Sequence, residues 1–255
     1  MASALGGCAV VVAALVGIAL LVWAVVYGHR KERERTAALA ALAQRRSWRF
    51  TPLDHGLANR MAGFPMFNLG HSRRGMNLME GELTLGGLRM SLLCGDYQYK
   101  VTTSNGKTTT TTTWNMSFIA VVPLLSVPED RTVRAEGFFD KIGAFLGMDD
   151  IDFESSEFSK RFHVQCSDRR FAFDLFDPRM MEFFLAVAPP RLHARSNCLL
   201  FDRGMRRWEA AEFEGELGWM DGFFLRVPRH VRAARLPKSE HATDPILSPS
   251  NGETR

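Results

Sequence analysis

The amino-terminal stretch constrains this chain more than any other feature, because residues 2–28 contain no charged side chain. A helix from Leu5 to Tyr27 would be about 35 Å long, slightly more than the roughly 30 Å hydrocarbon core of a bilayer. Trp23 and Tyr27 lie near its end, where aromatic rings favour the headgroup region. We therefore predict that residues 1–28 are a transmembrane anchor. The alternative, a cleaved secretory signal, needs a basic start and a shorter apolar core.

The residues that follow predict the orientation of this anchor. Residues 29–35 carry four basic and two acidic side chains. Basic residues beside a span stay on the cytoplasmic side, so we expect the amino terminus outside and the remaining chain in the cytoplasm, at the plasma membrane. The three later cysteines, Cys94, Cys166 and Cys198, are widely spaced and odd in number. They fit a reducing compartment and lack the spacing of a zinc site.

Composition narrows the class of the remaining chain. All 19 phenylalanines lie between Phe50 and Phe224, and such a set needs a packed core. Outside the basic flank, positive and negative side chains nearly balance, so we expect no nucleic-acid partner. We predict a basic flank and helical stalk over residues 29–47, one domain over 48–236 and a disordered tail over 237–255.

The middle of this domain predicts an antiparallel β-meander. Strands over residues 78–85 and 88–101 flank Gly86-Gly87, and Asn105-Gly106 is a strong signal for a second tight turn before a strand over 108–122. Shorter strands are expected over residues 47–50, 151–154, 162–166 and 199–201. Helices are expected over residues 54–61, 138–146, 178–187 and 208–224. The prediction is therefore an α+β fold with one transmembrane helix, an antiparallel β-meander and about three packed helices.

Several motifs spread along the chain occur together in one known group of proteins. They include Phe64-Pro65-Met66-Phe67, Asn77-Leu78-Met79, Asp96-Tyr97-Gln98-Tyr99 and Asp177-Pro178-Arg179-Met180-Met181-Glu182. With the apolar anchor and basic flank, they make the chain resemble an uncharacterised family of single-span membrane-anchored proteins from actinobacteria-like genomes, a domain of unknown function. The resemblance implies an anchor followed by one domain. It supplies no catalytic residue.

Candidate chemistry is sparse. Asp150, Asp152 and Glu154 have the spacing of a calcium loop, but Ser155 replaces its glycine and Arg161 its final glutamate. The sequence also lacks the HExxH, GxSxG, P-loop and GxGxxG motifs. We therefore predict no catalytic residue, no cofactor site and no metal site.

Two surfaces remain as candidate binding sites. Basic residues near a membrane can contact anionic headgroups. The residues assigned to this role are Arg30, Lys31, Arg33, Arg35, Arg226, Arg229, Arg232 and Arg235. The second surface is a threonine-rich strand edge, Thr109, Thr110, Thr111 and Thr112, which an extended peptide could join. The leading hypothesis is a membrane-anchored cytoplasmic interaction or scaffolding module with a protein partner, and the alternative is an enzyme of unrecognised type acting near the membrane.

Overall fold

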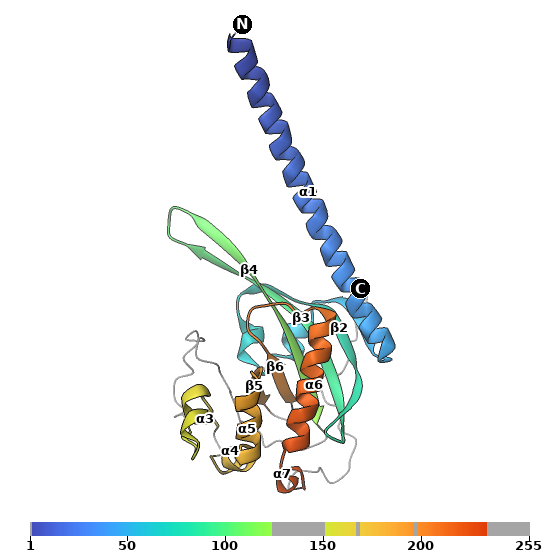
Figure 1. Ribbon diagram of the computed structural model, residues 1–255, viewed down its shortest axis with the longest axis vertical. Helices are drawn as coiled ribbons and strands as arrows, with labels where there is room; N and C mark the ends of the chain where they lie inside the picture. Colours follow the sequence, from blue (N-terminus) through green and yellow to red (C-terminus); the bar gives the residue numbers. More distant parts are fainter. Residues whose placement is uncertain (1, 124–150, 167–168, 196–197, 234–255) are drawn as a thin grey trace.

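The computed structural model describes residues 2–123, 151–166, 169–195 and 198–233, and within these ranges it describes the side chains from residue 15 to residue 231 except that of residue 123. Figure 1 shows a long first helix that extends from an α+β domain. The elements in chain order are α1 (Ala2–Arg45), β1 (Arg49–Asp54), α2 (Leu57–Arg60), the 3-10 helix η1 (Pro65–Asn68), β2 (His71–Leu85), β3 (Leu88–Ser104), β4 (Thr109–Pro123), α3 (Ser156–Arg161), α4 (Arg169–Leu175), α5 (Pro178–Ala186), β5 (Arg191–Arg195), β6 (Cys198–Asp202), α6 (Ala210–Arg226) and α7 (Arg229–Ala233).

The strands form a six-stranded sheet in the order β1-β2-β3-β4-β6-β5, and every neighbouring pair is antiparallel. The first four strands follow the chain order because tight turns join β2 to β3 and β3 to β4. β4 is long, and β6 pairs only with its residues Phe118–Val121. The β3–β4 hairpin therefore continues beyond the rest of the sheet (Figure 1).

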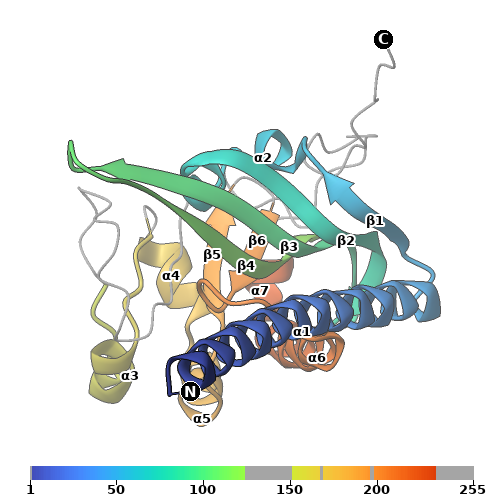
Figure 2. The same ribbon diagram turned by 90° about the horizontal axis from the view of Figure 1, so that it is seen from above.

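Two apolar layers cover the two faces of the sheet. The larger contains side chains from the end of α1 and from α3 to α7, and includes the fully buried Phe184, Trp208 and Phe223. The smaller lies under α2 and η1 on the other face, around Phe67 and Tyr97. Figure 2 shows α1 and α6 on one side of the sheet and α2 on the other. Most of the described phenylalanines are thus buried in a packed core, as expected, and the α+β class with an antiparallel meander is confirmed.

Both turns of the meander occur where the sequence places them. The β2–β3 turn contains Gly86 and Gly87, with φ of 55° and 77°. In the β3–β4 turn, Gly106 has a φ of 81° and the Asn105 side chain accepts hydrogen bonds from the backbone N–H groups of Lys107 and Thr108. Positive φ explains why glycine occupies these positions.

The helix predictions also agree where the residues are described. Asp177 caps α5 by accepting a hydrogen bond from the Met180 backbone N–H at 2.9 Å, and Pro178 begins the helix. The helix predicted over residues 208–224 is α6, and that over 54–61 is the single turn α2. The helix predicted over 138–146 and the tail over 237–255 lie outside the described residues.

Two strand predictions were wrong, and those for β1, β2 and β3 ended or began too early or too late: β2 begins seven residues before the predicted start at residue 78 and β3 ends three residues after the predicted end at residue 101. Residues 151–154 and 162–166 lie on either side of α3 and form no strand, although the Ile151 N–H donates to the Val164 backbone oxygen and His163 is an isolated bridge residue. Their alternating apolar side chains pack beneath helices, so alternation did not imply a strand. β1 runs past Pro52, because an edge strand tolerates a residue with no N–H to donate.

The first helix is continuous over its 44 residues. From Leu15 to Tyr27 its large apolar side chains are exposed, whereas Leu39, Leu42 and Ala43 are fully buried in the domain core. Over the part of the chain whose side chains are described, no helix has a stretch long and apolar enough to cross a membrane. The division at residue 48 remains a prediction, but the packed core includes side chains from the predicted stalk.

Candidate functional site: the junction of the first helix and the sheet

A buried ion pair joins α1 to the centre of the sheet. Arg35 reaches Asp96 on β3 with both terminal nitrogens, Nη1 to Oδ2 at 2.6 Å and Nη2 to Oδ1 at 2.9 Å. The two side chains are 7% and 0% exposed. The Arg35 Nε also donates to the Trp208 carbonyl oxygen at 3.0 Å. A paired, bidentate geometry of this kind compensates the desolvation of both charges and fixes their relative orientation.

The carboxylate of Asp96 has further partners on the neighbouring strands. Asn77 Nδ2 donates to Asp96 Oδ2 at 3.2 Å from β2, and the Ser117 hydroxyl donates to Oδ1 from β4. Ser117 in turn accepts the Trp208 backbone N–H at 2.8 Å. Through Ser117, the loop before α6 is therefore attached to the same carboxylate that binds α1.

A β-bulge directs Asn77 into this cluster. On β2 the register jumps between Met76 and Met79, so that Asn77 and Leu78 both lie opposite Gly95. Asn77 has a φ of 51° and Gly95 a φ of 151°. A Cβ atom on Gly95 would lie 2.7 Å from the backbone carbonyl oxygen of Asn77, so the bulge needs glycine at position 95.

A second, more exposed ion pair lies one helical turn earlier on α1. Arg207 donates to Glu32 with both terminal nitrogens, and its Nε lies 3.5 Å from Asp96 Oδ2. The hydrogen bond from Arg207 lowers the pKa of Glu32. Burial opposes protonation of Arg207, but the bond to Glu32 and the nearby Asp96 charge raise its pKa overall. Glu32 and Arg207 are thus charged at neutral pH.

Apolar contacts continue the junction along the same face of α1. Leu39 and Leu42 follow Arg35 at helical spacing and enter the core. On the strand beside them, Cys94 lies on the same sheet face as Asp96; burial and the Asp96 charge raise the pKa of its thiol. We call Glu32, Arg35, Asn77, Asp96, Ser117, Arg207 and Trp208 the junction cluster.

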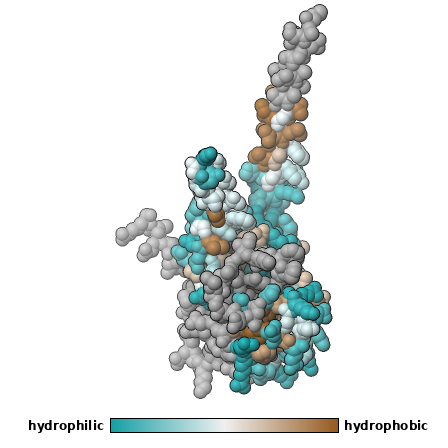
Figure 3. All heavy atoms as spheres, turned by 90° about the vertical axis from the view of Figure 1, so that its left-hand side faces the viewer, coloured by the Kyte–Doolittle hydropathy of each residue, from teal (hydrophilic) through white to brown (hydrophobic). Residues whose placement is uncertain are grey.

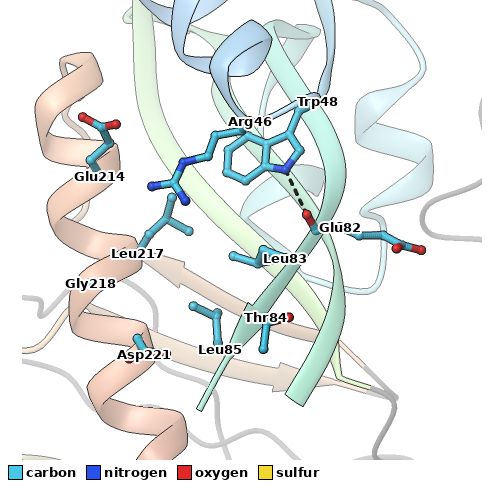
Figure 4. A pocket seen from close by; sticks show the side chains of 10 residues that line it. All are labelled: Arg46, Trp48, Glu82, Leu83, Thr84, Leu85, Glu214, Leu217, Gly218 and Asp221. Atoms are coloured by element: carbon cyan, nitrogen blue, oxygen red, sulfur yellow. Dashed lines mark hydrogen bonds between the residues drawn. The ribbon is translucent and has the colours of Figure 1, made fainter. Parts of the chain in front are cut away.

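A pocket of about 420 Å³ lies beside this junction, between the end of α1, β2 and α6. Figure 4 shows its lining side chains, with the Trp48 ring donating to the Glu82 carbonyl oxygen at 3.0 Å. Its three acidic side chains have partners: Glu82 pairs with Arg89, Glu214 with Arg45, and Asp221 accepts the Gly86 N–H. The ten lining residues include no histidine, cysteine or lysine.

A buried histidine–aspartate pair lies near the far edge of the sheet. His193 Nε2 on β5 lies 3.1 Å from Asp202 Oδ2 on β6, and Asp202 also accepts hydrogen bonds from Arg191 and the Gly204 backbone N–H. Burial opposes ionisation of Asp202, but these partners lower its pKa to about 2. His193 is 4% exposed, so the pair joins two strands and is closed to substrate.

The predicted headgroup residues fall into separate places. Arg30 is exposed and pairs with Glu34, and Lys31 lies 5.8 Å from the Tyr27 ring centroid. Arg35 faces the protein instead of solvent, because Asp96 and the Trp208 carbonyl bind its guanidinium. Arg33 is exposed on α1.

The carboxyl-terminal members of the set lie elsewhere. Arg226 donates to the Gly222 carbonyl oxygen and stacks 4.3 Å from the Phe183 ring centroid, while Arg229 is exposed on α7. Figure 1 places α7 at the end of the domain opposite the one from which α1 extends. Arg232 lies on α7, and Arg235 lies outside the described residues.

The threonine edge is confirmed as strand but stays a prediction as a binding site. Thr109 to Thr112 belong to β4 and pair with β3 from Ser104 to Val101. Among the described strands, none pairs with the other edge of β4 between Thr109 and Asn115.

Sequence reasoning missed the junction cluster. Arg35 and Asp96 are 61 residues apart, so no local motif links them. A signal was present all the same: Asp96 interrupts an apolar strand, and Arg35 shares a helical face with Leu39 and Leu42. Two residues of opposite charge, each at a position that faces the core, indicate a buried ion pair.

Comparison with known proteins gives one informative likeness. No family model matches the chain, and no curated protein matches it. Among solved structures, the fold is similar to the crystal structure of the mycobacterial trehalose monomycolate transport factor A, TtfA, with a TM-score of 0.51 and 13% sequence identity. The alignment covers 76% of this chain and 96% of that one. At this identity, the likeness establishes a shared fold.

Proposed function

We propose that this chain is a single-span membrane protein whose cytoplasmic α+β domain is an interaction or scaffolding module. One observation carries the proposal: a single continuous helix is exposed and apolar in one half and is locked into the domain in the other. Figure 3 shows the apolar belt on α1 directly before its hydrophilic flank. Large apolar side chains exposed around a whole helix need a lipid or protein environment, and the uncharged residues 2–28 favour lipid.

The junction cluster supports a scaffolding role because it makes helix and domain one rigid unit. A module tethered by a flexible linker would sample many orientations. Here the buried Arg35–Asp96 pair and the buried Leu39 and Leu42 hold the domain in one orientation relative to α1. A fixed orientation lets the domain present one surface to a neighbour in the same membrane.

The structural neighbour supports a non-enzymatic role. TtfA is described as a transport factor, and its similarity shows that this fold occurs in such a factor. We extend to this chain only the coarse part of that description, an accessory role at a membrane. The enzyme alternative has no comparable support, since each of the three carboxylates that line the described pocket is paired within the protein.

The partner-binding surface that we propose is the unpaired edge of β4 at Thr109 to Thr112. An exposed edge offers N–H and C=O groups that an extended peptide can join. These four residues are exposed, and β3 occupies only one side of the strand. Side chains there are short and uncharged, so the backbone is accessible to a partner.

Topology can be tested with engineered cysteines in cells. In a Cys8→Ala background, Ser3→Cys marks the amino terminus and Ser104→Cys marks the exposed hairpin, while Cys94, Cys166 and Cys198 are buried. A membrane-impermeant maleimide should label Ser3→Cys in intact cells and Ser104→Cys only after lysis. Labelling of Ser104→Cys in intact cells would refute the orientation, and release of the protein by alkaline carbonate would refute the anchor.

The binding edge can be tested by proline substitution. Consecutive N–H groups of a strand point to opposite sides. Of Thr110→Pro and Thr111→Pro, one therefore removes an N–H group that faces the unpaired edge, and the other removes an N–H group that faces β3. Thr110→Ala and Thr111→Ala are the controls that retain the backbone donor. We expect the proline at the outward-facing position alone to reduce partner capture from native membranes while the domain stays folded. Equal capture by all four variants would exclude this edge.

A further inference from the structure

The β3–β4 hairpin and α1 both start from the junction cluster and extend from the same side of the domain. Residues 102–114 of the hairpin, which we call the arm, are exposed throughout. Asp96 lies at the base of the arm and is bound by Arg35 of α1. Figure 1 shows the arm and the first half of α1 diverging from the domain in the same general direction.

Strand and helix geometry give the reach of each. From residue 97 to the turn at Asn105 the strand is about 26 Å long, at roughly 3.3 Å per residue. From Arg35 back to residue 28, where the proposed anchor ends, the helix is only about 10 Å long. An arm that is inclined to α1 therefore still has enough length to reach the plane at which α1 would enter a bilayer.

The charge of the hairpin suits an anionic surface. No acidic residue occurs between residues 97 and 123, whereas Lys100 and Lys107 are basic. Lys107 lies in the exposed turn, and Figure 3 shows this tip as hydrophilic. The basic flank of α1, with exposed Arg30, Lys31 and Arg33, would lie at the same membrane surface. Basic groups near an anionic leaflet are attracted to its headgroups.

We propose that the tip of the arm, Asn105 to Thr108, rests on the anionic lipid headgroups of the bilayer that holds α1. The inference depends on the proposed anchor and adds a second membrane contact to it. It also selects among the basic residues, because Arg226 and Arg229 lie at the opposite end of the domain, near α7, and would face away from that bilayer. Insertion of α1 and contact of the tip would together fix the orientation of the domain, and so of the β4 edge, relative to the membrane.

The experiment uses the full chain reconstituted into phosphatidylcholine vesicles with or without phosphatidylglycerol. In a Cys8→Ala background, a fluorophore on Thr108→Cys reports on the tip, and one on Arg229→Cys reports on the opposite end of the domain. Both sites are exposed. Lipids that carry a spin label on the headgroup quench a fluorophore that touches the surface. Flotation in alkaline carbonate first establishes that α1 is inserted.

We expect headgroup quenching of the Thr108 label, stronger with phosphatidylglycerol, and little quenching of the Arg229 label. Lys107→Gln should lower the ratio of contacting to non-contacting tips roughly fivefold, the factor that corresponds to one basic residue at an anionic surface. Lys160→Gln, the same change at an exposed position on α3, should leave the ratio unchanged. Equal quenching of the two labels in inserted protein would overturn the contact between the tip and the headgroups. It would leave the proposed anchor and the proposed protein-binding role of the β4 edge unaffected. Failure of flotation would overturn the anchor and the tip contact together.

Discussion

Removing the charge of Asp96 should destabilise this protein far more than removing that of any surface ion pair. Asp96→Asn keeps the shape of the side chain but removes the carboxylate charge that is hydrogen-bonded to the Arg35 guanidinium, which is 7% exposed. Breaking a buried pair from one side costs about 3–5 kcal/mol, a large share of the 5–15 kcal/mol that stabilises a typical domain. The exposed pair Arg30–Glu34, with side chains 78% and 60% exposed, provides an internal control. Glu34→Gln should leave the urea midpoint almost unchanged, because solvent screens this exposed pair.

The assay is urea unfolding of the full chain in detergent, followed by tryptophan fluorescence. Trp208 suits it because its carbonyl oxygen binds Arg35 and its ring is fully buried. A double-mutant cycle measures the coupling between the two side chains. It adds Arg35→Met and the double variant Arg35→Met/Asp96→Asn, in which the buried guanidinium charge is gone as well. We expect a coupling energy of at least about 2 kcal/mol, so that the double variant recovers part of the stability lost in Asp96→Asn.

Hydrogen exchange supplies a readout specific to docking. The backbone amides of residues 29–45 should exchange faster in Asp96→Asn than in the parent chain, because α1 would leave the sheet more often. A coupling energy below about 0.5 kcal/mol, with unchanged exchange over these residues, would refute the idea that this pair holds α1 to the domain.

Three further outcomes are expected. A Cβ on Gly81 would lie 2.1 Å from Cδ1 of Trp48, so Gly81→Ala should lower the free energy of unfolding by about 1–3 kcal/mol, measured by urea titration; an unchanged midpoint would mean that the ring moves freely. Phe184→Ala should cost about 3–5 kcal/mol in the same titration, since Phe184 is fully buried among aromatic rings. The pKa of Asp202 is lowered from 3.8 in the unfolded chain to about 2 in the folded protein. The ionised carboxylate therefore contributes fully to the free energy of unfolding above pH 3.8, and this contribution is lost as the pH falls toward 2. Thermal unfolding should therefore show about 2 kcal/mol less stability at pH 2 than at pH 5 from this group, and Asp202→Asn should remove that part of the pH dependence.

Local signals in the sequence predicted the meander and two helices because the determinants of these elements are themselves local. The positive φ angles of Gly86 and Gly106 and the cap at Asp177 each depend on a few neighbouring residues. The β5 strand and α4 were not predicted, since their short sequences carry no strong turn or cap signal. The strands expected around residues 151 and 164 failed because helices above them, and not a neighbouring strand, cover their apolar side chains.

The candidate site was harder to predict than the fold. A headgroup role for Arg35 rested on its place in a basic run, whereas its actual partner, Asp96, comes from a strand far along the chain. Which face of α1 docks depends on tertiary packing. The orientation of the arm relative to α1 likewise follows from the junction cluster, which only the three-dimensional structure displays.

The unbroken course of α1 makes the number of residues between its two halves a determinant of geometry. Each residue in a helix advances the chain by about 1.5 Å and turns it by about 100°. One residue inserted after Gly28 would rotate the apolar half by that angle relative to the arm, while Arg35 stayed bound to Asp96. Seven inserted residues would restore the original phase to within about 20°, at the cost of moving the domain about 10 Å further along the helix axis. Length changes in this segment therefore preserve the orientation of the apolar half only when they come close to a whole number of helical turns.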